Sequence, residues 1–394
     1  MTLSPKFPVT ADDFDLIQNI IDDSPAKDDG LLSGRLGLAF YYYNAFKITR
    51  AENWWRATVA CLREILDRLE EGNSTLTNPS FSSGLAGLGY VFEYIKREGL
   101  PAEIELADLP PTFDDFLVEG ALEMMKSNNV DFLHGAVGIL HYYASLPASD
   151  LTERILEYLI QQLIKDGVES WKGTWWRNSV LKEGLNCMNM SLAHGQCGIL
   201  LVLLNVLEKH GDKWNVSDTI RKGISFLLSS AGHVQAEKAS IFPFFTMENS
   251  GETFVGNRLA WCYGDMNVAW LLYRAGTRFG VREWIEVAEH VGLATITRRT
   301  HEETLIADAH YCHGAAGVTH MYRALHRITG KEDYKEAFDF WAIRTLTMAR
   351  EDAKASRYAG HEGSLLTGWP GIGLILMSVN LGVWTPWGEA FLLC

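Results

Sequence analysis

Hydrophobic positions divide the chain into two alternating kinds of helical segment. In the first kind nearly every position is apolar, as in Ile199–Leu207, and a helix of that composition is buried on all sides. In the second kind apolar residues recur every three or four positions with charges between them, which predicts an amphipathic helix. The clearest segments of this second kind are Asp114–Lys126, Leu151–Lys165, Trp214–Leu228, Trp284–Leu293 and Tyr334–Met348. We therefore expect helix pairs in which a polar-faced helix covers an apolar one.

A pair of glycines marks the start of each apolar segment. The two glycines stand three positions apart, and most copies of the pair follow one another at intervals of roughly fifty to sixty residues. The copies begin at Gly34, Gly84, Gly135, Gly195, Gly264, Gly314 and Gly368, and in the fifth copy Asn267 replaces the second glycine. A residue without a Cβ permits close backbone approach, so we expect most of these pairs to serve packing where the apolar helices begin.

Seven helix pairs can close on themselves with the apolar helices inside and the amphipathic helices outside. The sequence thus predicts an all-α fold, an α/α toroid (double seven-helix barrel) built from seven Gly-x-x-Gly helix-pair repeats. Because the repeats run through most of the chain, we expect a single domain over residues 1–394. Strand-like composition is limited mainly to Ala239–Phe245 and Thr253–Gly256, which predict a short hairpin or an ordered loop.

Helix starts gathered at one end of such a barrel would direct several partial positive charges at one place. That field favours thiolates and developing oxyanions, so we expect a functional site at this end. A loop containing Trp171, Trp175 and Trp176 either lines a substrate cleft or packs against the fold, and aromatic clusters of this kind more often pack.

Charge and cysteine content narrow the classes of function. The formal net charge of -14 argues against nucleic-acid binding, which needs a basic surface. The sequence has no signal-peptide pattern and no apolar stretch of membrane-spanning length, which predicts a cytoplasmic protein and leaves peripheral association with a membrane open. Six cysteines are too few to staple 394 residues with disulfides, so metal binding or catalysis is their favoured use.

Three candidate metal ligands stand just before the helix-start glycines of consecutive repeats. Cys262 lies in a Trp-Cys-Tyr-Gly run, and Cys312 and His313 lie together in a Tyr-Cys-His-Gly run. Two thiolates and one imidazole suit zinc and leave a fourth coordination position open for chemistry. The alternative is a helix-start histidine beside unrelated buried cysteines.

Histidine also precedes the first glycine of two other repeats, at His134 and His194. Because the pKa of an imidazole can be tuned across neutrality, His194 is a candidate acid–base group, and a packing role is the alternative. Asp131 could orient or charge-stabilise such a histidine, or it could act only as a loop or cap carboxylate. Arg258, four residues before Cys262, could stabilise an enolate or a carboxylate, or it could form a surface ion pair.

Together these features resemble the LanC-like family of lanthipeptide cyclases (lanthionine synthetase C). The resemblance runs from Gly34 to Gly371 and rests on the glycine repeats, the Ala-His-Gly run at His194 and the two cysteine motifs in consecutive repeats. It implies a double-layered, seven-fold α/α barrel. It also implies a Zn2+ site with three protein ligands, which are Cys262, Cys312 and His313.

The resemblance further implies which residues act in catalysis and what they do. The implied catalytic residues are His194, its partner Asp131, Arg258 and Tyr263. The implied reaction is Michael-type addition of precursor-peptide cysteine thiols to dehydroalanine or dehydrobutyrine, which forms lanthionine or methyllanthionine rings. The implied partners are a dehydrated precursor peptide and a separate dehydratase, because this chain has no room for a dehydratase domain.

Two alternatives to ring formation stay open. A LanC-like enzyme could instead add glutathione to dehydrated residues in proteins, and a zinc-stabilised chain could be a non-catalytic scaffold. One departure from the family pattern concerns the run after Trp-Cys-Tyr-Gly, where Asp265, Met266 and Asn267 stand in place of the usual Pro-Gly. Some family members carry an inserted substrate-engaging domain, for which the segment 235–256 is the candidate here.

Overall fold

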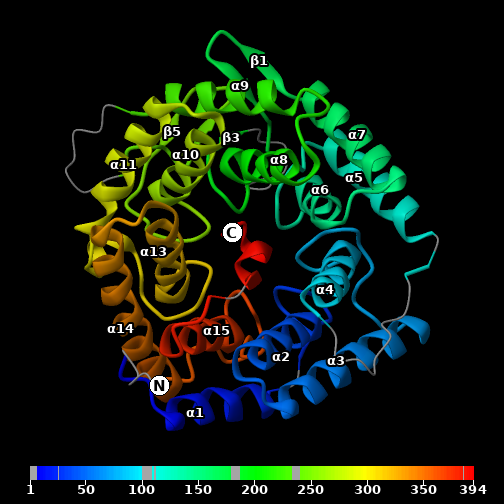
Figure 1. Cartoon of the computed structure of the whole chain (residues 1–394), viewed down its shortest axis with the longest axis vertical. Coiled ribbons are helices and arrows are strands. Elements are labelled where there is room, and N and C mark those ends of the chain that lie inside the picture. The colour runs from blue at the N-terminus through cyan, green and yellow to red at the C-terminus, as the bar shows by residue number, and fades with distance from the viewer. Residues whose placement is uncertain are drawn as a thin grey trace. The chain divides into compact units, whose positions relative to one another are not determined.

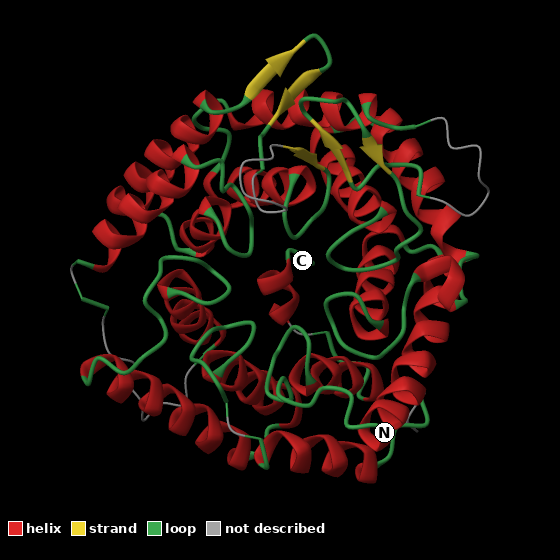
Figure 2. Ribbon diagram, turned by 180° about the vertical axis from the view of Figure 1, so that it is seen from behind, coloured by secondary structure: helices red, strands yellow, loops and turns green. Residues whose placement is uncertain are grey.

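The computed structural model describes residues 7–24, 26–99, 109–110, 112–178, 187–232, 240–384 and 386–394. Helices account for most of these residues, and strands are few and short (Figure 2). The chain forms two compact units, which are described separately below. The first unit comprises Met1–Thr77, Leu259–Trp261 and Arg299–Cys394, and the second comprises Asn78–Arg258 and Cys262–Arg298. A single domain over residues 1–394 stays a prediction.

Apolar and amphipathic helices alternate in the first unit, most of whose helices are labelled in Figure 1. Its helices are α1 (Ala11–Asp22), α2 (Arg35–Thr49), α3 (Glu52–Glu70), α12 (His301–Thr304), α13 (Ala315–Thr329), α14 (Glu332–Lys354) and α15 (Trp369–Asn380), followed by the 3-10 helix η1 (Pro386–Phe391). The apolar helix α15 contacts both α2 and α13, while α3 covers α2 and α14 covers α13. The predicted pairing of an apolar with an amphipathic helix is therefore present, although the amphipathic segments named from the sequence did not include α1 or α3.

The second unit repeats the same pairing. Its helices are α4 (Leu85–Glu98), α5 (Phe113–Lys126), α6 (Ala136–Ser145), α7 (Asp150–Lys165), α8 (Gln196–His210), α9 (Val216–Ser229), α10 (Asp265–Phe279) and α11 (Arg282–Ile296). The helices α4, α6, α8 and α10 contact one another in that order. Helix α9 packs on α8 and α11 on α10, while α5 and α7 both pack on α6. Each predicted amphipathic segment of this unit lies within a few residues of one of these outer partners.

Short strands occur only within the second unit among the described residues. Strands β1 (Val168–Ser170) and β2 (Gly173–Trp175) form an antiparallel hairpin whose second strand lies on α9. Strands β3 (Cys187–Asn189), β4 (Phe245–Met247) and β5 (Thr253–Phe254) form an antiparallel sheet in that order. The hairpin expected around residues 239–256 is thus present, but its first strand begins at the end of the expected segment, and Ala239 lies outside the described residues.

The tryptophan-rich loop mainly packs against the fold. Trp175 stacks on Phe226 with ring centroids 6.0 Å apart, and the indole N–H of Trp176 donates to the Leu163 carbonyl at 2.7 Å. Trp171, at the tip of the β1–β2 hairpin, is instead 92% exposed. Residues 179–186, further along this loop, lie outside the described part of the chain.

The glycine pairs are required by the loops that lead into the apolar helices. We call the seven residues that end on the first glycine the leading loop, for example Asn189–Gly195 ahead of α8. A Cβ on Gly195 would lie 2.1 Å from the Asn189 carbonyl oxygen, and a Cβ on Gly198 would lie 2.1 Å from the Leu192 carbonyl oxygen. Neither distance is compatible with a side chain, so both positions need glycine. The pairs serve packing, and the helix's own leading loop supplies the tightest contacts.

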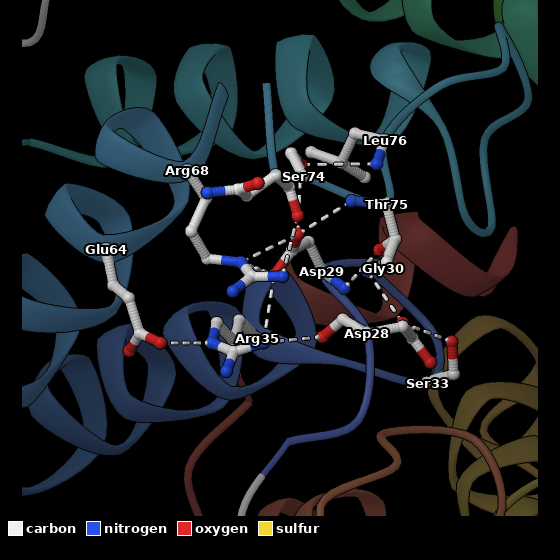
Figure 3. A network of polar contacts seen from close by, with 11 residues as sticks. Asp28, Asp29, Gly30, Ser33, Arg35, Glu64, Arg68, Ser74, Thr75 and Leu76 are labelled. Carbon is white, nitrogen blue, oxygen red and sulfur yellow. Dashed lines mark hydrogen bonds and ion pairs between the residues drawn. The ribbon is translucent and has the colours of Figure 1, made fainter. Parts of the chain in front are cut away.

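In the first unit, a buried carboxylate fixes the leading loop of α2 (Figure 3). Asp29 accepts hydrogen bonds from Arg35 (3.0 Å), Arg68 (3.2 Å), the Ser74 hydroxyl (2.9 Å) and the Thr75 N–H (2.9 Å). Burial would raise the pKa of Asp29, but these hydrogen bonds and the Arg68 charge outweigh burial and lower it. The ionised carboxylate therefore ties the loop before α2 to the loop after α3.

None of the described helices combines the length and the apolar composition needed to cross a membrane.

Candidate active site

Two side chains accept backbone hydrogen bonds that shape the leading loop that carries His194. The Asn189 side-chain oxygen accepts from the Ser191 N–H at 2.9 Å, and the Ser191 hydroxyl accepts from the His194 N–H at 3.0 Å. Each acceptor lies two or three residues before its donor in the sequence. Asn and Ser side chains commonly accept such short-range bonds from the backbone, and these bonds hold the turn of the loop. The loop delivers His194 to the position directly before Gly195, the N-cap of α8.

Asp131 and His194, which the sequence placed in different repeats, meet in the second unit. Asp131 is fully buried. One carboxylate oxygen accepts the N–H groups of Leu133 (2.5 Å) and His134 (2.7 Å), and the other contacts Nδ1 of the His194 ring. This arrangement places a proton on Nδ1 of His194 and leaves Nε2 as the nitrogen that faces away from the carboxylate.

The surroundings of His194 favour its protonated form. Burial alone would lower the pKa of its imidazole, but the hydrogen bond and the charge of Asp131, with a further contribution from Cys262, raise the pKa above its ordinary value. The half-buried ring is therefore more readily protonated than an ordinary imidazole. A charged imidazole is a competent general acid.

Tyr263 borders the same site. Its hydroxyl oxygen accepts a hydrogen bond from the Asn189 side-chain amide at 3.0 Å, and its ring lies 5.8 Å from that of His194. On its other side the ring meets Phe244 edge-on at 5.6 Å. Burial raises the pKa of Tyr263 to about 12, so the phenol stays neutral and its O–H remains a donor.

Arg258 is half-buried, and its backbone carbonyl lies against Gly264. A Cβ on Gly264 would lie 2.5 Å from the Arg258 carbonyl oxygen, and Gly264 has φ +112°, a conformation that favours glycine. Within the described ranges the guanidinium makes no ion pair, and no contact joins it to Asp131 or His194.

The run that departs from the usual Pro-Gly has a structural use. Asp265 is buried at the start of α10 and accepts the N–H groups of Ile241 (2.9 Å) and Phe242 (3.1 Å). Asn267 accepts the N–H of Leu192 at 3.2 Å. These two side chains fasten the segment before β4 and the His194 loop to α10. Sequence reasoning missed both roles, and the only signal was polar residues in the first turn of an otherwise apolar helix.

The candidate metal ligands occupy equivalent positions in their own units. Cys262, two residues before Gly264 in the second unit, is buried. Cys312 and His313, just before Gly314 in the first unit, are half-buried, and the Cys312 N–H donates to the Leu366 carbonyl at 2.9 Å.

An additional histidine lies beside His313. The His310 ring meets the His313 ring edge-on with centroids 4.2 Å apart, and its Nδ1 contacts the Asp308 carboxylate. His310 is almost fully buried. Sequence reasoning missed this pair, although an Asp-x-His run six to four residues before a helix-start glycine was a usable signal.

Comparison with known proteins identifies the fold and the family. A solved structure named nisin cyclase superposes with a TM-score of 0.73 at 16% sequence identity, covering 96% of this chain and 96% of that chain. At that identity the likeness shows the fold alone, and it confirms the predicted all-α fold of the α/α toroid class. A variant of an alpha-1,6-mannanase from Salegentibacter sp. superposes with a TM-score of 0.46 at 8% identity, covering 94% and 98% of the two chains, which is too distant to carry an argument.

The sequence match is the more decisive comparison. The family model described as lanthionine synthetase C-like protein matches residues 25–392, from before the first glycine repeat to the residue after η1. The match includes the leading loops that carry His194, Cys262 and Cys312. The chain therefore belongs to the lanthionine synthetase C-like family.

Proposed function

We propose that this protein is a zinc-dependent lanthipeptide cyclase. It adds cysteine thiols of a dehydrated precursor peptide to dehydroalanine or dehydrobutyrine and so forms lanthionine or methyllanthionine rings. Membership of the LanC-like family and the fold shared with a nisin cyclase support a peptide-cyclising role. The observation that carries the proposal is the contact between buried Asp131 and His194, which supplies an acid at a helix start.

The donor set suits zinc. Cys262, Cys312 and His313 each offer one ligand atom and together form a group that could hold a metal ion. Two thiolates and one imidazole are ligands that zinc prefers, and they leave one coordination position for a substrate. When bound there, zinc would lower the pKa of a substrate thiol so that it reacts as a thiolate near neutral pH.

The residues around His194 supply the rest of the chemistry. Conjugate addition places negative charge on the carbonyl oxygen of the dehydrated residue, and the α-carbon must then receive a proton. His194, kept protonated by Asp131, is the donor to the α-carbon. The Arg258 guanidinium and the Tyr263 hydroxyl are the groups that would stabilise the developing enolate.

The proposal extends to the organisation of the pathway. It includes a single functional domain over residues 1–394, which the family match over residues 25–392 supports. The substrate must already contain dehydrated residues, so a separate dehydratase has to act first. We propose that dehydration and cyclisation both take place in the cytoplasm.

The proposal is tested with the purified full chain and a synthetic peptide that carries one dehydroalanine and one cysteine. Cyclisation consumes the free thiol, detected by alkylation, without changing the peptide mass. Asp131→Asn should lower the rate by about 100-fold or more, because the amide cannot hold the imidazole protonated. Trp171→Ala, at the exposed hairpin tip, is the matched control and should keep the wild-type rate.

The same assay separates the competing functions. If the peptide thiol persists while glutathione adds to a dehydrated protein, the glutathione-adding alternative is correct. If neither thiol is consumed by zinc-loaded protein, the cyclase proposal is wrong.

A further inference from the structure

A second imidazole lies directly beside the Asp131–His194 pair. His134 stands immediately before Gly135, as His194 stands before Gly195. The two rings are nearly parallel, with an interplanar angle of 18° and centroids 6.2 Å apart. Because the Asp131 carboxylate accepts the His134 N–H at 2.7 Å as well as contacting the His194 ring, one buried carboxylate positions both histidines.

Ser82 fixes the orientation of the His134 ring. The Ser82 hydroxyl lies 2.7 Å from Nδ1 of His134, and the Ser82 N–H donates to the Leu133 carbonyl at 2.9 Å. Ser82 is buried, whereas the His134 side chain is exposed. With Nδ1 engaged by a buried partner, Nε2 is the ring nitrogen available to a substrate or to solvent.

The two histidines have opposite charge preferences. The titratable groups that face His134 are Asp131 and His194. Although part of the side chain is exposed, partial desolvation of the ring lowers the pKa of His134. The Asp131 charge opposes that effect and the His194 charge adds to it, so the net result is a lowered pKa. The pKa of His194 is raised. Neighbouring groups whose surroundings push their pKa values apart are suited to serve as a base and an acid in one reaction.

We propose that His134 is the general base of the proposed cyclisation, taking the proton that the substrate thiol releases, while His194 is the acid. This inference rests on the proposed function. The S–H bond of the substrate breaks and its proton passes to Nε2 of His134. The sulfur forms a bond to the β-carbon, the π-electron pair moves into the enolate, and the α-carbon takes a proton from His194.

The overall change is addition of one S–H across one C=C bond, with no oxidation or reduction. After each turnover His134 carries an extra proton and His194 lacks one. Transfer of a proton between the parallel rings, directly or through solvent, restores both. The exposure of His134 allows the solvent route, whereas the His194 ring is half-buried.

Chemical rescue tests the inference on the zinc-loaded full chain with the dehydroalanine–cysteine peptide. His134→Ala should lower kcat by about 100-fold, a typical contribution of a general base, and added imidazole should restore part of the loss. KM and zinc content should stay at their wild-type values, because His134 is not a proposed ligand. His290→Ala, an exposed histidine of α11, should keep the wild-type rate and show no response to imidazole.

The outcomes distinguish this inference from the proposed function. If wild type cyclises and His134→Ala does so at the same rate, His134 is not the base and only the inference fails. A loss in His134→Ala that imidazole does not rescue, while His134→Gln keeps the wild-type rate, would assign His134 a packing role and also overturn it. If wild-type protein does not cyclise the peptide, the proposed function fails, and the inference with it.

Discussion

The indole N–H of Trp261 donates a hydrogen bond to the backbone carbonyl of Phe391 at 2.9 Å. This bond joins the residue before Cys262 to η1 at the end of the chain. The Phe391 ring also lies 4.2 Å from the ring of Tyr311, the residue before Cys312. The C-terminal segment therefore supports, from within the first unit, the residue that precedes each proposed zinc cysteine.

Removing this aromatic support should destabilise the protein. Phe391→Ala is expected to lower the free energy of unfolding by about 3–5 kcal/mol, because it leaves a cavity beneath Trp261 and Tyr311. Urea denaturation monitored by circular dichroism measures the change in the free energy of unfolding. Trp171→Ala removes a larger but exposed aromatic ring and should change the free energy by no more than about 0.5 kcal/mol. Equal effects in the two variants would mean that η1 does not support the core.

Metal content tests the proposed ligand set. Wild-type protein should carry about one zinc per chain, and Cys262→Ala and Cys312→Ala should each lose it while keeping the helical circular dichroism spectrum. Cys394→Ala removes an exposed cysteine and should retain the metal. If purified wild-type protein binds no zinc, the proposed metal site is wrong. Global unfolding of Cys312→Ala would instead favour a structural zinc and the scaffold alternative.

The leading-loop geometry predicts which glycines tolerate a side chain. Gly198→Ala should lower the free energy of unfolding by about 1–3 kcal/mol, because its Cβ would overlap the Leu192 carbonyl oxygen and the loop would have to shift. In Gly363→Ala the nearest atoms to the new Cβ are Leu38 methyls at 3.7 Å, an ordinary contact. That variant should be neutral or slightly stabilised. Thermal melting of both variants checks the expectation, and equal melting temperatures would contradict it.

An ion pair in the first unit predicts a change in stability at acid pH. Arg350 donates to both carboxylate oxygens of Asp13, at 2.7 and 2.8 Å, and this hydrogen bonding, opposed by burial and aided by Thr10, lowers the pKa of Asp13 from 3.8 to about 2. A depressed carboxyl pKa stabilises the fold above the unfolded-state pKa, and that stabilisation is lost as the pH falls through the folded-state pKa.

Asp13→Asn measures this contribution. At pH 7 the variant should be less stable than wild type by about 0.2–1 kcal/mol, the range for a surface ion pair, because the Arg350 side chain is exposed. The difference should shrink between about pH 4 and pH 2, because protonated aspartic acid resembles asparagine. Denaturant titrations across that range provide the measurement, and a difference that does not vary with pH would show that the Asp13 charge contributes nothing.

The sequence determined the helical pairing because hydrophobic periodicity is a local property of the chain. The spacing of Leu151–Lys165 predicted α7 within one residue, and the glycine pairs located the start of each apolar helix. The resemblance to the LanC-like family, and not the periodicity, indicated that Asp131 is the partner of His194. In the structure, no described hydrogen bond or ion pair joins Arg258 to either residue.

Only the tertiary structure decided which distant side chains meet. Asp29 and Asp265 are both buried carboxylates, yet their hydrogen-bond donors come from other loops, and no spacing in the sequence pairs Asp265 with Ile241 or Asp29 with Arg68. The same holds for the bond between Trp261 and Phe391, which are 130 residues apart. Periodicity specifies what each helix buries, whereas the partner of a buried polar group depends on how the helices pack against one another.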